Sequence, residues 1–221
     1  MRNFARQFFH PSFGKCFVLL FALCCAGHGL ASDLASEQGM VKNLGGTPAT
    51  RSAAVAEGKN NAAFCANCHG ETGNSKYPEV PNLAGQNPDY LLTQMKKFET
   101  GARKNEFMQR LIKLLGDRER ATIALFYADA AVEPARPSAG QAAARGAAHF
   151  ARLCVRCHGA QARGSETVPR LAGQQGKYLR LSLDRYRAAS GERIDPLMTA
   201  ATSQIPASDV DAVVDYLSSL K

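Results

Sequence analysis

A six-residue motif, Cys65-Ala66-Asn67-Cys68-His69-Gly70, returns later in the chain as Cys154-Val155-Arg156-Cys157-His158-Gly159. The pattern Cys-x-x-Cys-His is the attachment signature of c-type haem. Two thiols at this spacing can reach the two vinyl groups of the porphyrin, and the histidine that follows offers its imidazole to the iron as the proximal ligand. The sequence therefore predicts two covalently bound haem c groups. Their attachment residues are Cys65, Cys68, Cys154 and Cys157, and their proximal ligands are His69 and His158.

Two other kinds of site use the same residue types. Structural zinc sites usually combine one Cys-x-x-Cys with a second, distant pair of ligands, whereas each motif here offers two cysteines and a directly adjacent histidine. A thioredoxin-like dithiol needs strands that alternate with helices, and no segment of this sequence has the alternation typical of a strand. Zinc and redox-active thiols are therefore the less favoured alternatives.

The first 31 residues have the features of a secretory signal peptide. Arg2, Arg6 and Lys15 are followed by an apolar run at positions 16–26, and Gly29-Leu30-Ala31 is a plausible cleavage site. The apolar run is 11 residues long, which is too short to cross a bilayer as a helix. The sequence predicts export, with an uncleaved membrane anchor as the alternative.

The signal peptide changes the meaning of the cysteine count. Three of the seven cysteines lie in residues 1–31, and the other four are those of the two haem motifs. Exported proteins often carry disulfides, but here every remaining thiol is needed for haem attachment. We therefore expect no structural disulfide in the mature chain.

The similarity between the two halves extends beyond the haem motifs. Val80-Pro81-Asn82-Leu83-Ala84-Gly85-Gln86 matches Val168-Pro169-Arg170-Leu171-Ala172-Gly173-Gln174 at an offset of 88 residues. A period of this length is well above the roughly 20–50 residues of solenoid repeats, so each copy is interpreted as a small domain. The expected boundaries are a signal peptide at 1–31, a flexible lead-in at 32–52, an N-terminal domain at 53–132, a Pro-rich linker at 133–138 and a C-terminal domain at 139–221.

The secondary-structure patterns are helical in both copies. Ala-rich stretches at residues 53–64 and 140–153 lead into the haem motifs. Downstream, apolar residues recur at helical spacing, as in Leu91-Met95-Phe98, Leu179-Leu183-Tyr186 and Val210-Val213-Val214-Leu217. The predicted fold class is all-α, with two tandem helical domains. Because units of about 85 residues have difficulty burying enough apolar surface, we expect a haem to complete each core.

The sixth iron ligand decides whether such a haem carries electrons or binds small molecules. A methionine thioether closes the iron and raises its reduction potential, which suits electron transfer. Met198 is the single methionine of the second half, and Met108 holds the matching place in the first half. Met95 competes with Met108, but it aligns with Leu183 on an apolar helical stripe, where methionine usually packs in the core. We expect Met108 and Met198 to be the ligands.

Two further pairs of residues recur beside the motifs. The backbone carbonyl of Pro81 or Pro169 could accept a hydrogen bond from the proximal histidine and fix its tautomer, with a simple turn as the alternative. Tyr90 and Tyr178 are expected to pack in the core or between helices, because nothing in the sequence gives them a chemical role.

The charge is unevenly distributed along the chain. The formal net charge is +8, and residues 134–221 hold 12 basic and 7 acidic residues, against 12 and 11 in residues 33–132. Nucleic-acid binding is not expected, because basic and aromatic residues are not interleaved. The basic excess predicts docking of the second domain onto an acidic partner or surface, or simply a solvated basic face.

Taken together, the paired motifs, the Pro-x-Leu-Ala-Gly-Gln segments, the tyrosines Tyr90 and Tyr178 and the methionines Met108 and Met198 resemble the dihaem cytochrome c4 family. The resemblance covers residues 53–220. It implies two class I cytochrome c domains related by a pseudo-twofold, each with His/Met iron, in a periplasmic carrier that is soluble or loosely held at the membrane. The chain departs from its own repeat at Glu106-Phe107, where the second copy has Pro196-Leu197.

The predicted function is that of an electron carrier and not of an enzyme. The resemblance implies that single electrons pass from a quinol-oxidising complex or a dehydrogenase to a terminal oxidase or reductase, while the protein binds and tunes the cofactors. The alternative is the dihaem electron-accepting subunit of a flavocytochrome c-type sulfide dehydrogenase. A haem enzyme or gas sensor would require that Met108 or Met198 does not bind iron.

Overall fold

The computed structural model describes residues 34–133 and 141–221, and only the backbone of Gln141 and Ala142. The expected signal peptide and residues 134–138 of the expected linker lie outside these ranges. Residues 37–221 form one compact unit. Within the described residues, no helix combines the length and apolar character that a bilayer crossing demands.

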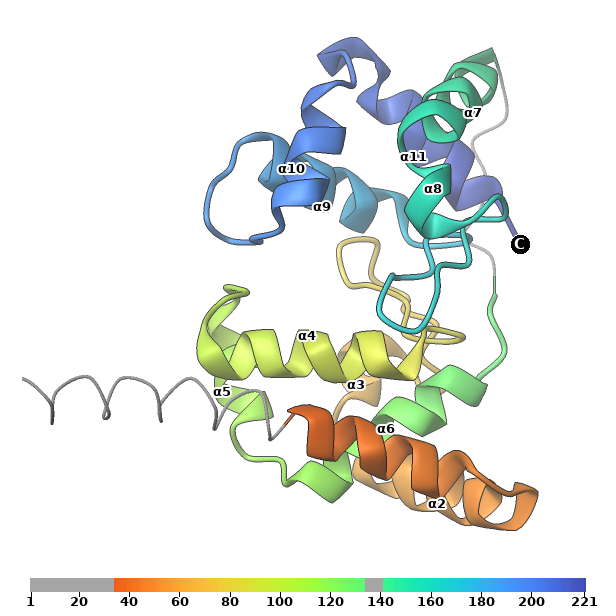
Figure 1. Ribbon diagram of the computed structural model, residues 1–221, viewed down its shortest axis with the longest axis vertical. Helices are drawn as coiled ribbons and strands as arrows, with labels where there is room; N and C mark the ends of the chain where they lie inside the picture. The colour runs from red at the N-terminus through yellow and green to blue at the C-terminus, as the bar shows by residue number, and fades with distance from the viewer. Residues whose placement is uncertain (1–33, 134–140) are drawn as a thin grey trace, which may run out of the picture. The chain divides into compact units, whose positions relative to one another are not determined.

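The same order of helices occurs twice, as Figure 1 shows. We call residues 37–133 the N-terminal lobe and residues 141–221 the C-terminal lobe. After a helical stretch at residues 34–45, the N-terminal lobe contains α2 (Pro48–Asn61), α3 (Ala66–His69), α4 (Pro88–Thr100), α5 (Glu106–Ile112) and α6 (Asp117–Asp129). The C-terminal lobe contains α7 (Gln141–Leu153), α8 (Val155–His158), α9 (Gly176–Arg187), α10 (Pro196–Ser203), the 3₁₀ turn η1 (Ala207–Asp209) and α11 (Val210–Ser219). The all-α prediction is confirmed.

The expected flexible lead-in at 32–52 is wrong for residues 34–52, which are mostly helical. Residues 34–45 are helical, and α2 begins at Pro48 because Thr47 and Thr50 form a reciprocal capping box in front of it. A threonine cap satisfies amides of the first turn, and proline is preorganised for the first helical position. The two helices are separated only by Gly46 and Thr47.

The predicted apolar stripes form the core of the C-terminal lobe. Val210, Val213 and Leu217 of α11 are almost completely buried and pack with Leu179 of α9 and Phe150 of α7. In the N-terminal lobe, Leu91, Met95 and Phe98 of α4 are also buried. The core of each lobe thus forms where the sequence periodicity places it.

A buried glycine brings the first and last helices of each lobe into close contact. A Cβ atom on Gly58 of α2 would lie 2.0 Å from the Thr122 carbonyl oxygen on α6, and one on Gly146 of α7 would lie 1.9 Å from the Ala212 carbonyl oxygen on α11. These distances are far inside van der Waals contact. Only glycine fits at either crossing.

We expect Gly58→Ala and Gly146→Ala each to lower the free energy of unfolding by about 1–3 kcal/mol or more, because overpacking forces the helices apart. Thermal unfolding of the haem-loaded protein measures this. Gly39→Ala is the matched control, since a Cβ there has no neighbour within 4 Å and alanine favours the helix. A Gly146→Ala protein as stable as the Gly39→Ala protein would contradict the close crossing.

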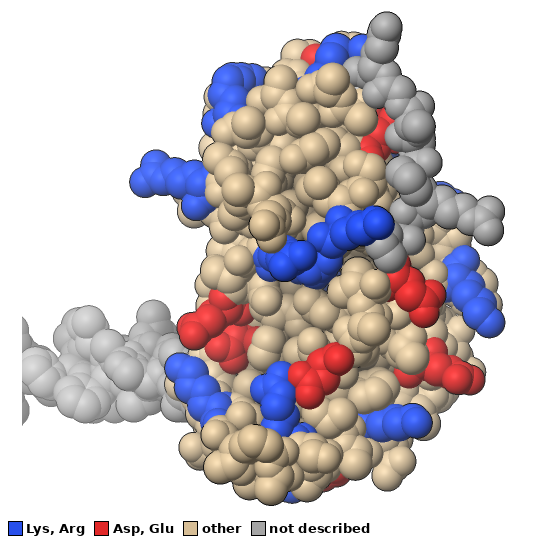
Figure 2. Space-filling model, turned by 90° about the vertical axis from the view of Figure 1, so that its right-hand side faces the viewer, with Lys and Arg blue, Asp and Glu red and all other residues tan. Residues whose placement is uncertain are grey.

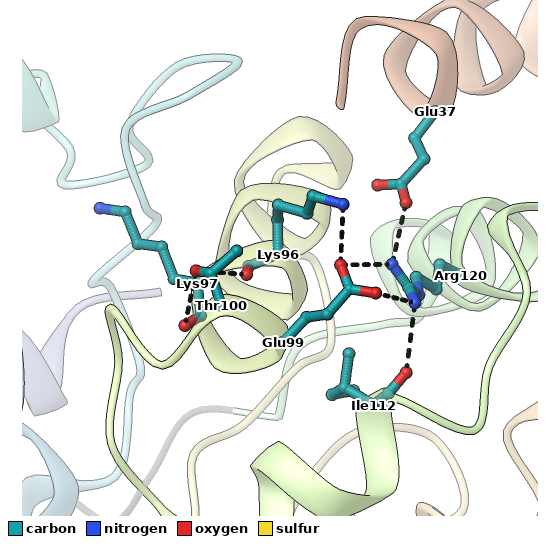
Figure 3. Close-up of polar contacts among 7 residues, drawn as sticks. All are labelled: Glu37, Lys96, Lys97, Glu99, Thr100, Ile112 and Arg120. Carbon is teal, nitrogen blue, oxygen red and sulfur yellow. Dashed lines mark hydrogen bonds and ion pairs between the residues drawn. The ribbon is translucent and has the colours of Figure 1, made fainter. Parts of the chain in front are cut away.

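A buried ionic cluster ties the start of the N-terminal lobe to its last helix (Figure 3). Arg120 of α6 is 4% exposed and donates to Glu37, which is 0% exposed, at 3.1 Å. It also donates to both carboxylate oxygens of Glu99 on α4 at 3.1 and 2.8 Å, and to the Ile112 carbonyl oxygen at 3.4 Å. Arg120 therefore joins the helical stretch at 34–45, α4 and the end of α5.

Replacing Arg120 by leucine should lower the free energy of unfolding by about 3–5 kcal/mol, because the fully buried Glu37 carboxylate loses its paired cation. Glu99 keeps Lys96, which lies 2.8 Å from it. Chemical denaturation of the haem-loaded protein tests this. Arg110→Leu is the control, since Arg110 pairs with Glu106 on the exposed side of α5 and such pairs contribute about 0–1 kcal/mol. Equal losses in the two variants would contradict the proposed role of the cluster.

Glu99 should make the stability that this cluster provides depend on pH in the acid range. Its hydrogen bonds from Arg120 outweigh burial and lower the pKa to about 2, below the value of about 4.3 in an unfolded chain. Because the folded-state pKa is the lower one, the stabilisation is present above about pH 5 and is lost as the pH falls toward about 2. The stability difference between the wild type and Glu99→Gln should shrink over this window in denaturation curves measured at successive pH values.

Candidate functional site

Each haem motif forms one short helical turn. Cys65 is the N-cap of α3, and Cys68 and His69 lie within it; Cys154, Cys157 and His158 take the same places in α8. All four cysteines are free thiols, with Cys65 and Cys154 partly buried and Cys68 and Cys157 exposed. Burial raises the pKa of Cys65, and it raises that of Cys154 to about 11. The raised pKa values keep the Cys65 and Cys154 thiols protonated at neutral pH.

The chain turns sharply behind the first motif. Gly70 has φ +82°, and a Cβ atom there would lie 2.2 Å from the Asn74 carbonyl oxygen. Glycine is the residue that adopts this left-handed backbone at little cost. The turn brings the following loop, with Pro81, back over His69.

The two motif histidines are buried and held in the same way. His69 is 9% exposed and its Nδ1 lies 2.9 Å from the Pro81 carbonyl oxygen; His158 is 4% exposed and its Nδ1 lies 3.0 Å from the Pro169 carbonyl oxygen. A carbonyl only accepts, so Nδ1 carries the proton and Nε2 keeps a free lone pair. Burial lowers the pKa of both histidines, although the carbonyl contact opposes this. Each imidazole is neutral and oriented as a metal ligand requires.

The N-terminal lobe contains a cavity of about 490 Å³ beside His69. This volume lies within the roughly 300–1,000 Å³ typical of cofactor and ligand pockets. Its wall is mostly apolar and includes Leu91, Phe98 and Ile123, while Cys65, Cys68 and His69 also line it. A flat apolar macrocycle with two attachment points and one axial ligand fits these residues.

The cavity holds two methionines. Met108 lies in the first turn of α5, where the Asn105 side chain accepts from its backbone N–H at 3.0 Å. Met95 also lines the cavity, from α4. The structure thus brings His69, Met108 and the competing Met95 to one cavity.

In the C-terminal lobe, Met198 occupies the corresponding turn. It lies in α10, and the Asp195 side chain accepts from its backbone N–H at 3.1 Å. Asn105 and Asp195 are 90 residues apart, as are Met108 and Met198. The same capping arrangement therefore places a methionine at the same point of both lobes.

An arginine–tyrosine cluster lies where the two lobes meet. The Tyr178 hydroxyl accepts from Arg103 at 3.0 Å and from Arg193 at 2.9 Å, and Arg193 also donates to the Tyr90 hydroxyl at 3.1 Å. Burial alone would raise the pKa of Tyr178, but the two guanidinium groups outweigh it and lower the pKa to about 7. Arg103, Tyr90 and Tyr178 also line the haem-sized cavity.

Sequence reasoning gave the two tyrosines a packing role only and missed the arginines. The signal was present in the repeat, because Arg103 and Arg193 are 90 residues apart, like Met108 and Met198. The two segments form an antiparallel bridge at Arg103 and Arg193. An arginine repeated in register with the cofactor residues would have identified the cluster.

A second set of contacts between the lobes involves two glutamines of the repeated segments. Gln174 bonds to the backbone N–H and carbonyl of Asn82, and Gln86 bonds in the same way to Arg170. Both glutamines are buried, at 5–6% exposure. The sequence comparison identified them as repeated residues without giving them a role.

The zinc alternative finds no support in the arrangement of donors. Within residues 34–133 and 141–221, no three His, Cys, Asp or Glu side chains gather into a cluster that could hold a metal ion. The first motif offers the His69 imidazole beside a mostly apolar cavity, which is the setting of a haem ligand.

Comparisons with known proteins agree with this arrangement. The cytochrome c family model matches residues 55–123 and again residues 143–221. Cytochrome c4 of Pseudomonas aeruginosa is 31% identical over 177 residues, covering 75% of this chain and 88% of the relative. A protein of Thiomonas intermedia described as a thiosulfate dehydrogenase electron acceptor is 32% identical over 184 residues, covering 77% of this chain and 82% of the relative.

A solved structure shows the same architecture. The crystal structure of reduced cytochrome c4 from Pseudomonas stutzeri superposes with a TM-score of 0.68 at 26% identity, covering 74% of this chain and 97% of that one. Two matches to the family model in one chain indicate tandem domains, each with covalently bound haem c. With two such domains in the order and arrangement of its relatives, the chain belongs to the dihaem cytochrome c4 family.

Proposed function

We propose that this dihaem electron-transfer protein works in the periplasm as a mobile carrier, taking single electrons from a quinol-oxidising complex or a dehydrogenase and delivering them to a terminal oxidase or reductase. The observation that carries the proposal is the cavity in which an imidazole fixed by the Pro81 carbonyl and the Met108 side chain lie together. Two axial ligands per iron leave no open position, so such a site exchanges electrons and not ligands.

The proposed cofactor residues follow the repeat. In the N-terminal lobe, Cys65 and Cys68 attach the haem (haem one), and His69 and Met108 are its axial ligands. In the C-terminal lobe, Cys154 and Cys157 attach the haem (haem two), and His158 and Met198 are its axial ligands. Haem supplies the reversible one-electron chemistry of iron. The chain orients the imidazoles, excludes water from the cavity with Leu91, Phe98 and Ile123, and so tunes the potential.

The arginine–tyrosine cluster supports the same assignment. Arg193 is 8% exposed, and its hydrogen bonds go to the hydroxyls of Tyr178, Tyr90 and Ser182. A buried cation needs a nearby anion to offset the loss of its hydration. Tyr178, whose pKa is lowered to about 7, meets part of this need at Arg193. The carboxylates of a haem in the cavity would add negative charge at Arg103, which lines it.

The domain limits and location remain part of the proposal. We propose domains at 53–132 and 139–221, a linker at 133–138 and a secretory signal peptide at 1–31. The family matches at 55–123 and 143–221 fall within these domains. Lys and Arg side chains are interspersed with Asp and Glu on the face that Figure 2 shows. A mixed surface of this kind suits transient docking onto a redox partner, or loose attachment to a membrane surface. It does not suit tight binding to one polyanionic partner.

A second candidate function is that of a dedicated acceptor subunit of a dehydrogenase. Relatives described as thiosulfate dehydrogenase electron acceptors favour it. The electron donor would then be a thiosulfate dehydrogenase and not the sulfide dehydrogenase that we expected from the sequence. Purification of the native chain distinguishes the two candidates. We expect recovery as a free dihaem protein, whereas a dehydrogenase that stays bound through size-exclusion chromatography would support the subunit.

We expect the wild-type ferrous protein, with two haems per chain, to bind no carbon monoxide. Met108→Ala should open one haem and Met198→Ala the other, because each removes one axial thioether. Loss of that ligand should also lower the reduction potential of the same haem. Carbon monoxide titration followed by absorbance, with haem counted on the same sample, measures the first effect, and a redox titration measures the second.

Met95→Leu is the matched control, since Met95 lines the same cavity from α4. It should leave both haems closed to carbon monoxide. If Met95→Leu opened haem one and Met108→Ala did not, the ligand assignment in the N-terminal lobe would be wrong. Carbon monoxide binding by the intact wild type would contradict the carrier function itself.

A further inference from the structure

We propose that each haem is tuned by a glutamine of the opposite lobe, Gln174 for the N-terminal lobe and Gln86 for the C-terminal lobe. The effect passes through one peptide group, whose carbonyl faces the proximal histidine and whose N–H faces the glutamine. The inference rests on the proposed iron ligands His69 and His158. It adds a determinant of the potentials and a coupling between the two lobes.

The peptide between Pro81 and Asn82 carries the contact in the N-terminal lobe. Its carbonyl oxygen lies 2.9 Å from His69 Nδ1, and its N–H donates to Gln174 Oε1 at 2.7 Å. Gln174 Nε2 in turn donates to the Asn82 carbonyl oxygen at 2.9 Å. Because a backbone N–H can only donate and a backbone carbonyl can only accept, these two bonds fix which end of the glutamine amide faces which group.

The C-terminal lobe repeats the arrangement. The peptide between Pro169 and Arg170 faces His158 Nδ1 with its carbonyl oxygen at 3.0 Å, and its N–H donates to Gln86 Oε1 at 2.8 Å. Gln86 Nε2 donates to the Arg170 carbonyl oxygen at 3.0 Å. Each lobe thus completes the hydrogen-bonded chain behind the other lobe's histidine.

The direction of the effect follows from the polarity of a peptide group. When its N–H donates, the carbonyl oxygen gains negative charge and accepts more strongly. A stronger acceptor at Nδ1 makes the imidazole a better electron donor to the iron, which favours the oxidised state and lowers the reduction potential. Asn82, Gln86 and Gln174 are all 5–6% exposed, so water does not screen the effect.

Gln174→Met provides the sharper test. Methionine has a similar length and no acceptor of comparable strength, and Gln174 is not among the residues that line the N-terminal cavity, whereas Gln86 is. We expect the haem of the N-terminal lobe to become easier to reduce by about threefold in its one-electron equilibrium constant, or about 28 mV at 59 mV per tenfold. The haem of the C-terminal lobe should shift less.

The potentials must be assigned haem by haem. Haem-methyl NMR signals, linked to each lobe by contacts with its own residues, can be followed through a redox titration of the full-length dihaem protein. The amide proton of Asn82 should also move upfield in Gln174→Met, because it loses its acceptor. A role limited to holding the lobes together would not single out the potential of the haem in the lobe opposite the mutation.

Two variants serve as controls. Gln175→Met removes bonds between the lobes, from Gln175 Nε2 to the Ser75 carbonyl oxygen at 2.7 Å and to Asn82 Oδ1 at 3.2 Å, but leaves the peptide behind His69 untouched. It should not raise the potential of the N-terminal haem. Gln174→Glu keeps an acceptor oxygen in either protonation state. The reduction potential of the N-terminal haem in this variant should therefore equal the wild-type value or lie below it.

Three outcomes would overturn the proposal: no shift in Gln174→Met, a shift confined to the C-terminal haem, or an equal shift in Gln175→Met. Failure of the proposed function has a different signature. The wild type would then bind carbon monoxide or lack the NMR signals of coordinated histidine, whereas failure of the tuning proposal leaves both properties intact.

Discussion

The hydrogen bond between the motif histidine and a proline carbonyl is the constraint on which the site depends. In the N-terminal lobe it joins His69 on α3 to Pro81, 12 residues later, and the same bond joins His158 to Pro169. The bond fixes the imidazole tautomer and at the same time fixes the loop that carries the proline. Because the loop is fixed, the N–H of the same peptide group faces the other lobe. Ligand geometry and domain contact are therefore two consequences of one backbone position.

The two lobes keep this constraint but support their methionine helices differently. The last carbonyl groups of α5 and α10 accept from an arginine in both cases, at Ile112 from Arg120 (3.4 Å) and at Thr202 from Arg187 (2.7 Å). Arg120 comes from α6 and Arg187 from α9. A cation at the end of a helix complements its dipole, so either source serves. Only Arg120 is deeply buried beside carboxylates, and Glu37 and Glu99 accompany it.

Sequence reasoning succeeded where a residue acts through local spacing or through its place in the repeat. The haem motifs, the all-α class and the stripe of Val210, Val213 and Leu217 depend on local periodicity, and the structure confirms the helices. It failed at residues 34–52, where glycines and a proline suggested flexibility although Thr47 caps a helix. It could not foresee the contact of Gln174 with Asn82, because the two residues are 92 positions apart and no local pattern joins them.

The arginines between the lobes complete the physical argument. Arg193 donates to the hydroxyls of Tyr178, Tyr90 and Ser182, and Arg103 donates to Tyr178 and to Gln94. Tyr178, whose pKa is lowered to about 7, offsets part of this positive charge. The Tyr90 and Ser182 hydroxyls and the Gln94 amide are neutral partners, and a buried charge without enough nearby opposite charge is costly. The carboxylates of a haem held in the cavity that Arg103 lines would add negative charge at this cluster. Haem binding would then favour the contact between the lobes here, in addition to the hydrogen bonds that Gln86 and Gln174 already make.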